Sequence, residues 1–134
     1  MIRLNYLDHV AIHVVDMEKS AAWYEEVLGL KKYKLKEWGE FPIFMLSGKC
    51  GVAIFPADAS LPAIDKLYKG PKIDHFAFNV DQAEFEKAKL HYEKLELKYV
   101  FQDHHYFHSI YTKDPDGHTV ELTTLVVDEK EFYL

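Results

Sequence analysis

Several residue types are scarce in this chain, and each shortage excludes a class of protein. Cys50 is the only cysteine, so no disulfide can form within the chain and a disulfide-stapled domain is excluded. Every apolar run falls short of the roughly eighteen residues that a membrane span needs. Asp8 and His9 interrupt the first apolar stretch after Met1, before it reaches the length of a signal peptide. These absences predict a soluble, cytoplasmic protein.

Positive charge is also in short supply. Sixteen Lys and Arg residues stand against twenty-two Asp and Glu residues, for a formal net charge of -6, and Arg3 is the single arginine. A field of this sign repels phosphate backbones and anionic lipid surfaces, so neither nucleic acid nor a membrane is expected as a partner. Hydrophobic residues, by contrast, make up 49% of the 134 residues and aromatic residues 15%, enough to build one domain around a packed core.

The sequence repeats itself. Residues 7–14 read L-D-H-V-A-I-H-V, and residues 73–80 read I-D-H-F-A-F-N-V. Further matches of the same kind align residues 28–31 with 95–98 and residues 51–54 with 119–122. Self-similarity at a fixed spacing indicates that one structural unit occurs twice.

The repeat predicts one α+β domain over residues 1–134, built of two βαβββ modules. Module one covers about 5–56, a linker containing Pro and Gly covers about 57–71, and module two covers about 72–127. After each helix we expect three strands, at 30–38, 41–47 and 50–55 in module one and at 97–103, 106–113 and 118–127 in module two. The linker also contains a short helical pattern at 64–68.

Local signals mark the ends of both predicted helices. Asp16 and Asp81 stand where a residue that caps a helix N-terminus belongs, and Glu84 follows Asp81 at the spacing of a capping box. Gly29 stands where a left-handed residue ends the first helix.

Side chains alternate across a strand, so each strand divides into two faces. The apolar face of the first strand suits packing on the helix, which leaves His9 on the other face, and the strand that begins module two repeats this with His75. In the last strand Glu121 lies opposite the apolar side. We therefore expect His9, His75 and Glu121 to share the face of the sheet that carries no helix.

Two imidazoles and a carboxylate are a ligand set for a divalent transition metal that leaves coordination positions open. His9, His75 and Glu121 are therefore candidate metal ligands. The plainer alternative is that the paired Asp-His motifs are only a relic of duplication.

These residues lie in three longer motifs. They are L-D-H-V-A-I-H-V-V-D-M-E-K-S-A-A-W-Y-E-E-V-L-G-L at 7–30, D-H-F-A-F-N-V at 74–80 and S-I-Y-T-K-D-P-D-G-H-T-V-E-L at 109–122. With them the chain resembles, over nearly its whole length, the vicinal oxygen chelate superfamily. That superfamily contains glyoxalase I, extradiol dioxygenases, methylmalonyl-CoA epimerases, fosfomycin-resistance thiol transferases and bleomycin-resistance proteins.

The resemblance implies a curled mixed sheet that forms a cleft around one divalent metal. By similarity the ligands fall on His9, His75 and Glu121. Members similar to glyoxalase I have a fourth ligand, a carboxylate on the last strand of module one, but Ala53 stands there. Three ligands fit the dioxygenase-like and fosfomycin-type branches instead. Small members of this family commonly form dimers, so a homodimer acting on a small molecule is expected.

The resemblance leaves the reaction open between branches. Tyr111 matches the tyrosine that hydrogen-bonds substrate in extradiol dioxygenases, so it is the candidate catalytic residue, although an ordinary aromatic strand residue is the alternative. A phosphonate substrate needs cations, and Lys130 is the only basic residue after Glu121. We therefore expect an oxidoreductase of the extradiol dioxygenase type with Fe²⁺.

The alternatives are a fosfomycin-type thiol transferase, or an isomerase or lyase of the glyoxalase or epimerase type, with Mn²⁺, Ni²⁺, Co²⁺ or Zn²⁺. A metal-free binding protein of the bleomycin-resistance type is the non-enzymatic alternative. The residues whose roles stay open on the sequence are His13, Asn79, His104, His105 and His108.

Overall fold

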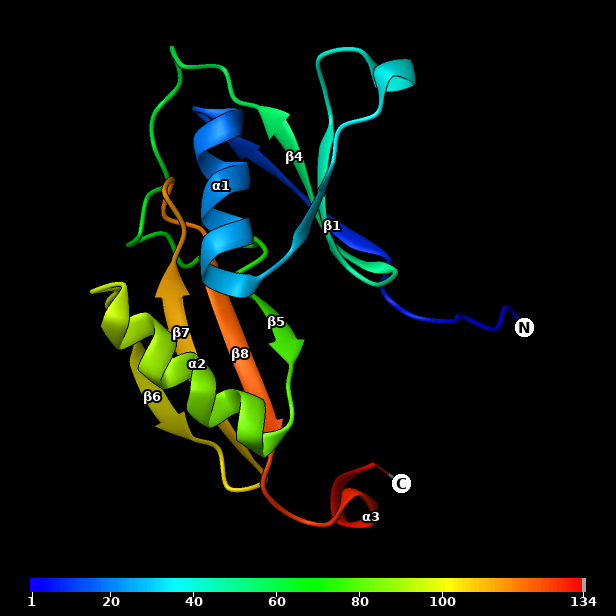
Figure 1. Ribbon diagram of the computed structural model, residues 1–134, viewed down its shortest axis with the longest axis vertical. Helices are drawn as coiled ribbons and strands as arrows, with labels where there is room; N and C mark the ends of the chain where they lie inside the picture. Colours follow the sequence, from blue (N-terminus) through cyan, green and yellow to red (C-terminus); the bar gives the residue numbers. More distant parts are fainter. Residues whose placement is uncertain (134) are drawn as a thin grey trace. The chain divides into compact units, whose positions relative to one another are not determined.

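The computed structural model describes residues 1–133 and divides them into two compact units (Figure 1). The first ends at Ala63 and the second begins at Ile64, so the boundary falls inside the predicted linker. The grouping of both modules into one domain stays a prediction.

The first unit contains one helix, one short 3-10 helix and four strands. In chain order they are β1 (His9–Val14), α1 (Met17–Leu28), β2 (Lys31–Tyr33), η1 (Lys36–Trp38), β3 (Ile43–Ser47) and β4 (Cys50–Pro56). The strands form one sheet in the order β1-β4-β3-β2. β1 runs parallel to β4, and the other neighbours are antiparallel.

The second unit repeats this arrangement. Its elements are β5 (Phe76–Asn79), α2 (Gln82–Lys94), β6 (Val100–Asp103), β7 (Phe107–Lys113), β8 (Thr119–Leu125) and a short α3 (Glu129–Phe132). The sheet order is β5-β8-β7-β6, with β5 parallel to β8. The predicted α+β fold of two βαβββ modules is thus confirmed as two four-stranded mixed sheets, each with a helix across it (Figure 1).

Each unit has its own core between helix and sheet, because burial of apolar surface drives the packing of each helix on its sheet. The helices contribute their most buried aromatic side chains, Tyr24 in α1 and Tyr92 with Phe85 in α2. The sheets supply fully buried apolar side chains, among them Ile43, Met45, Val52 and Ile54 in the first unit and Ile110 and Val120 in the second. On β1 the predicted alternation holds, with Ile12 and Val14 buried and His9, Ala11 and His13 exposed.

The predicted helix caps are present. Asp16 Oδ1 accepts a hydrogen bond from the Lys19 backbone N–H at 3.0 Å, and Asp81 Oδ1 accepts one from Glu84 at 2.8 Å. α1 ends at Gly29, whose φ of 68° is left-handed, and the Gly29 N–H donates to the Glu25 carbonyl at 2.9 Å.

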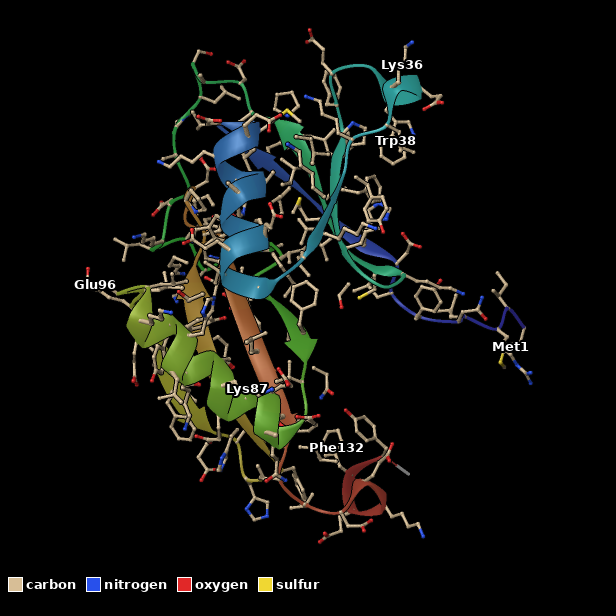
Figure 2. The ribbon with its side chains drawn as sticks, viewed as in Figure 1. Met1, Lys36, Trp38, Lys87, Glu96 and Phe132 are labelled. Atoms are coloured by element: carbon tan, nitrogen blue, oxygen red, sulfur yellow. The ribbon has the colours of Figure 1, made fainter. Side chains whose placement is uncertain are left out.

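Two predicted elements are wrong. The strand expected at 30–38 ends at Tyr33, and η1 follows it at Lys36–Trp38 (Figure 2). The ammonium groups of Lys32 and Lys34 both bind the Glu18 carboxylate, and the chain then turns at Gly39, whose φ is 72°. The helix expected at 64–68 is absent from the described chain, which forms only a turn at 66–67.

Within residues 1–133, none of the helices is long and apolar enough to cross a membrane.

Candidate metal site in the second unit

The face of the second sheet that lies away from α2 carries a row of polar side chains. β8 lies between β5 and β7, with Glu121 paired to Ala77 on one side and to Tyr111 on the other. His75 directly precedes β5. Because paired residues on neighbouring strands point to the same face, this register explains why Glu121 and Tyr111 adjoin each other and why His75 reaches them.

Two of the three predicted ligands are in contact in this unit. The distance between His75 Nε2 and Glu121 Oε2 is 2.9 Å. Glu121 is only 6% exposed although it is charged, and a buried carboxylate is stable only with a partner. The His75 imidazole is that partner in the structure.

Asp74 fixes the orientation of the His75 ring. The Nδ1–H of His75 donates to Asp74 Oδ2 at 2.8 Å, and this hydrogen bond is the main cause that lowers the pKa of Asp74. With Nδ1 donating to Asp74, the other ring nitrogen, Nε2, faces Glu121. An imidazole nitrogen and a carboxylate oxygen at 2.9 Å can share a proton or bind one metal cation.

This donor set fits a divalent metal. An imidazole nitrogen and a carboxylate oxygen that bind one ion at about 2.1 Å lie about 3 Å apart when the angle between the bonds is near 90°. A carboxylate that holds the other ring nitrogen is also the usual support of a metal-binding histidine. Within neither unit, over residues 1–133, do three His, Cys, Asp or Glu side chains gather into a complete site. The second unit therefore provides a pair of candidate ligands.

Tyr111 lies beside this pair. Its ring meets the His75 ring edge to face, with 5.4 Å between centroids and 84° between planes. Its hydroxyl oxygen is 2.9 Å from Nε2 of His104. Burial first, then the charge of Glu121 and a hydrogen bond to that carboxylate, raise the pKa of Tyr111. Tyr111 is consequently held as a neutral phenol that can donate a hydrogen bond.

The third predicted ligand, His9, belongs to the first unit. Its Nδ1–H donates to Asp8 Oδ1 at 2.7 Å, as His75 does to Asp74, so its Nε2 is also left available. Its ring packs edge-on against Phe44 with 5.1 Å between centroids. The joining of His9 to His75 and Glu121 around one metal stays a prediction.

The register shows which residue of the first unit stands at the position of Glu121. Ala53 pairs with Ala11 on β1 and with Phe44 on β3, just as Glu121 pairs with Ala77 and Tyr111. Ala53 is fully buried. The position of the glutamate in one unit is thus apolar in the other.

The histidines with open roles lie in different surroundings. His13 Nδ1 is 3.1 Å from the Pro56 carbonyl oxygen. His108 Nε2 is 3.7 Å from Asp103 Oδ2, and its ring contacts Phe101. His105 has a left-handed φ of 69° in the turn between β6 and β7, and His104 contacts Tyr111.

Sequence reasoning missed two neighbours of the site. Contact between His104 and Tyr111 has no periodic signal, because His104 lies in a turn rather than on a strand. A periodic signal was present for Lys113, because it is two residues from Tyr111 and so lies on the same strand face. Its ammonium donates to the Thr119 hydroxyl.

Comparisons with known proteins agree with this architecture. Residues 6–122 match the model of the Glyoxalase/Bleomycin resistance protein/Dioxygenase superfamily. A metallothiol transferase, FosB, of Lysinibacillus sphaericus (strain C3-41) is 31% identical over 133 residues, which cover 95% of this chain and 87% of the relative. A probable trivalent organoarsenical cleaving enzyme of Bacillus subtilis (strain 168) is 31% identical over 126 residues, which cover 84% of this chain and 75% of the relative.

The fold is also that of solved structures. A glyoxalase/dioxygenase from Nostoc punctiforme superposes with a TM-score of 0.77 at 19% identity, covering 91% of this chain and 92% of that one. Because the family model spans most of the sequence and the two-module topology is present, the chain belongs to the Glyoxalase/Bleomycin resistance protein/Dioxygenase superfamily.

Proposed function

We propose that this protein is a metal-dependent thiol transferase, which adds a low-molecular-weight thiol to an epoxide on a small oxygen-bearing molecule. The observation that carries the proposal is the His75–Glu121 pair, whose donor atoms are 2.9 Å apart, with the Tyr111 phenol hydrogen-bonded to the same carboxylate. The similarity to a metallothiol transferase over 95% of the chain supports this branch of the superfamily above the extradiol dioxygenases.

In this proposal His9, His75 and Glu121 hold one divalent ion, with Asp8 and Asp74 orienting the two imidazoles. The bound ion would act as a Lewis acid on a substrate oxygen. Thiol addition needs no redox change, so Mn²⁺, Ni²⁺, Co²⁺ or Zn²⁺ suits it as well as Fe²⁺ does.

The reaction forms a C–S bond and breaks one C–O bond of the epoxide. The thiol gives up its proton to solvent, its sulfur attacks an epoxide carbon, and the electron pair of the broken bond moves to the oxygen, which takes a proton. Tyr111 supplies a hydrogen bond where negative charge develops, since its raised pKa keeps the phenol protonated. Removal of such a donor costs on the order of a hundredfold in rate.

A cation near this site supports an anionic substrate. Lys113 lies on the strand face of Tyr111 and Glu121, and its ammonium donates to Thr119 rather than to a carboxylate of the described chain. An ammonium without a carboxylate partner can bind a substrate phosphonate or carboxylate. The scarcity of arginine therefore does not count against the thiol transferase as strongly as the sequence suggested.

The test is turnover by protein loaded with one metal at a time. Protein with Mn²⁺ is incubated with fosfomycin, an epoxide that bears a phosphonate, and with cysteine or glutathione, and the thioether is followed by ³¹P NMR. We expect a new resonance that depends on metal and thiol and disappears in Glu121→Gln. If no metal among Mn²⁺, Ni²⁺, Co²⁺ and Zn²⁺ supports thioether formation, the proposal is wrong.

The extradiol dioxygenase is the second candidate, favoured by the place of Tyr111 beside His75. Its test is Fe²⁺ reconstitution without oxygen, followed by catechols under oxygen, where ring cleavage gives a yellow product. Metal analysis of protein purified without oxygen separates both enzymes from a metal-free binding protein, which would contain no stoichiometric metal.

This chain has few side chains that could bind a trivalent organoarsenical substrate. Trivalent arsenic is a soft centre that binds thiolates, and this chain offers a single thiol, that of Cys50. The similarity to the Bacillus subtilis protein therefore supports the superfamily and the metal rather than this substrate.

We also propose a homodimer. Each sheet has unpaired edges, β1 and β2 in the first and β5 and β6 in the second, and exposed edges are usually covered. The segment before β1 exposes the apolar residues Met1, Ile2, Leu4, Tyr6 and Leu7. Sedimentation equilibrium at micromolar concentration should give twice the chain mass of 15.7 kDa, and a species of 15.7 kDa alone would contradict the dimer.

A further inference from the structure

The Tyr111 hydroxyl has three polar neighbours. The Glu121 carboxylate and the Ser109 hydroxyl are hydrogen-bond partners of it, and its oxygen is 2.9 Å from Nε2 of His104. A carboxylate can only accept a hydrogen bond, so the single phenol proton is the one shared with Glu121. Ser109 donates its own proton to the Thr123 hydroxyl at 3.0 Å, which leaves Nε2–H of His104 to donate to the phenol oxygen.

The turn between β6 and β7 holds His104 in place. The His104 backbone N–H donates to the Phe107 carbonyl at 2.8 Å, and the Tyr106 N–H donates to the His104 carbonyl at 2.8 Å. Asp103 Oδ1 accepts from the backbone N–H of His105 at 2.8 Å. His105 adopts a φ of 69°, a left-handed conformation that a residue with a side chain keeps only where its surroundings enforce it.

The contact with His104 can fix the direction of the Tyr111 phenol proton. The phenol C–O bond lets the proton rotate, and the edge-to-face contact with His75 fixes the ring but not the hydroxyl hydrogen. When the phenol oxygen accepts a hydrogen bond on one side, the phenol's own proton points to an acceptor on the other side. The turn between β6 and β7 therefore fixes the orientation of the Tyr111 hydroxyl through the imidazole of His104.

From this geometry we infer that His104 is a positioning residue, which donates to the Tyr111 oxygen and so holds the phenol proton on the side of Glu121, from which it can turn to a substrate oxygen bound there. The inference rests on the proposed function for the identity of the reacting oxygen. The contact itself does not depend on that function.

The first test compares variants in the Mn²⁺-loaded thiol addition to fosfomycin. We expect His104→Ala to lower kcat about tenfold with little change in KM, because the hydroxyl would be misdirected mainly in the transition state. His104→Gln, whose amide N–H can donate from a similar place, should recover most of that loss. His108→Ala is the matched control, since His108 is in the same hairpin but contacts Phe101 and should leave kcat unchanged.

A double-mutant cycle separates positioning from a general structural effect. If His104 acts through the hydroxyl, His104→Ala should have no further effect on kcat in a Tyr111→Phe background. An equal loss of kcat in both backgrounds would overturn the inference, as would wild-type kcat in His104→Ala.

A measurement that does not need turnover distinguishes failure of the proposed function from failure of the inference about His104. Protein with 3-fluorotyrosine in place of its tyrosines gives a ¹⁹F resonance for position 111, assigned by its loss in Tyr111→Phe. In metal-free protein that resonance should shift in His104→Ala and return toward its original place in His104→Gln, while His108→Ala leaves it unmoved. If thiol addition is absent but this pattern holds, the proposed function fails and the positioning contact stands. An unshifted resonance in His104→Ala overturns the inference.

Discussion

The two units share one backbone plan but differ at two positions of the same sheet face. In each, a histidine held by the preceding aspartate contacts an aromatic ring from the third strand. The second unit has Glu121 and Tyr111 where the first has Ala53 and Phe44. The topology is the same in both units. The two side-chain differences alone give the second unit a carboxylate and a phenol on this face, and the first unit neither.

The comparison also explains which features of this face come from the fold and which from chemistry. The Asp-His pairs and the edge-to-face ring contacts occur in both units, so they follow from the shared strand register. Glu121 is different, because a carboxylate that is 6% exposed costs free energy unless a cation compensates it. Asp114 is also buried, but its carboxylate accepts backbone hydrogen bonds from Asp116 and His118 in a turn, whereas the buried carboxylate of Glu121 faces His75 and so indicates function.

The largest effect is expected from making the second unit resemble the first. Glu121→Ala should lower the affinity for Mn²⁺ more than about 100-fold, since loss of a direct ligand should exceed the loss seen for groups that only support ligands. Calorimetric titration measures the affinity, and circular dichroism checks the fold. Thr123→Ala, on the same strand face, is the control and should bind Mn²⁺ as the wild type does. Unchanged affinity in Glu121→Ala would show that Glu121 is not a ligand.

The next prediction compares the two aspartates. Asp74→Ala should weaken Mn²⁺ binding about 10-fold to 100-fold, because His75 loses the carboxylate that fixes its ring. Asp8→Ala should have an effect of the same size if His9 is the third ligand. Asp74→Asn, which still accepts a hydrogen bond, should recover part of the affinity. If Asp8→Ala binds Mn²⁺ like the wild type, His9 is not part of the site.

The sequence predicted the faces of the three strands that carry His9, Glu121 and the residues after His75, and the reason is physical. Alternation of apolar and polar side chains, capping aspartates and Gly29 act over a few residues, so their signals can be read locally. They were sufficient for two βαβββ modules and for placing Glu121 on the face away from the helix.

What failed depends on contacts between distant residues. β2 ends early where Lys32 and Lys34 bind Glu18, which lies fourteen to sixteen residues away along the chain. The contact of His104 with Tyr111 depends on a left-handed backbone at His105, and the residue types at 104–106 do not predict that conformation. The short α3 was also missed, although Asp128 and Glu131 form a capping box there.

A third prediction concerns alkaline pH and the second unit. Burial in the α2 core raises the pKa of Tyr92 far above its ordinary value. Below about pH 10 both folded and unfolded chains keep this proton, so the full stability is present. Above it the unfolded chain loses the proton first, and the free energy of unfolding should fall by about 1.4 kcal/mol per pH unit from this group. Urea unfolding between pH 9 and 11 measures the slope, which should be shallower in Tyr92→Phe; an identical slope would contradict the assignment to Tyr92.

The smallest predicted effect comes from the ends of the two helices. The residue after the last turn of α1 is Gly29, with a φ of 68°, and the corresponding residue after α2 is Glu96, with a φ of 56°. A left-handed backbone costs a residue with a Cβ about 1 kcal/mol, whereas glycine adopts it freely. Glu96 lies at the exposed end of α2 (Figure 2), so its side chain can be removed without opening the core.

Glu96→Gly should therefore raise the free energy of unfolding by up to about 1 kcal/mol, and Gly29→Ala should lower it by about the same amount. Urea titrations at pH 7 measure both changes. Glu93→Gly is the control, because glycine in the body of the same helix lacks this advantage and should be destabilising by about 1 kcal/mol. If Glu96→Gly also destabilises, the left-handed turn in the second unit is already relieved by its hydrogen bonds, among them the one from the Leu97 N–H to the Tyr92 carbonyl at 2.9 Å. The two helix ends would then differ in how they accommodate the same backbone.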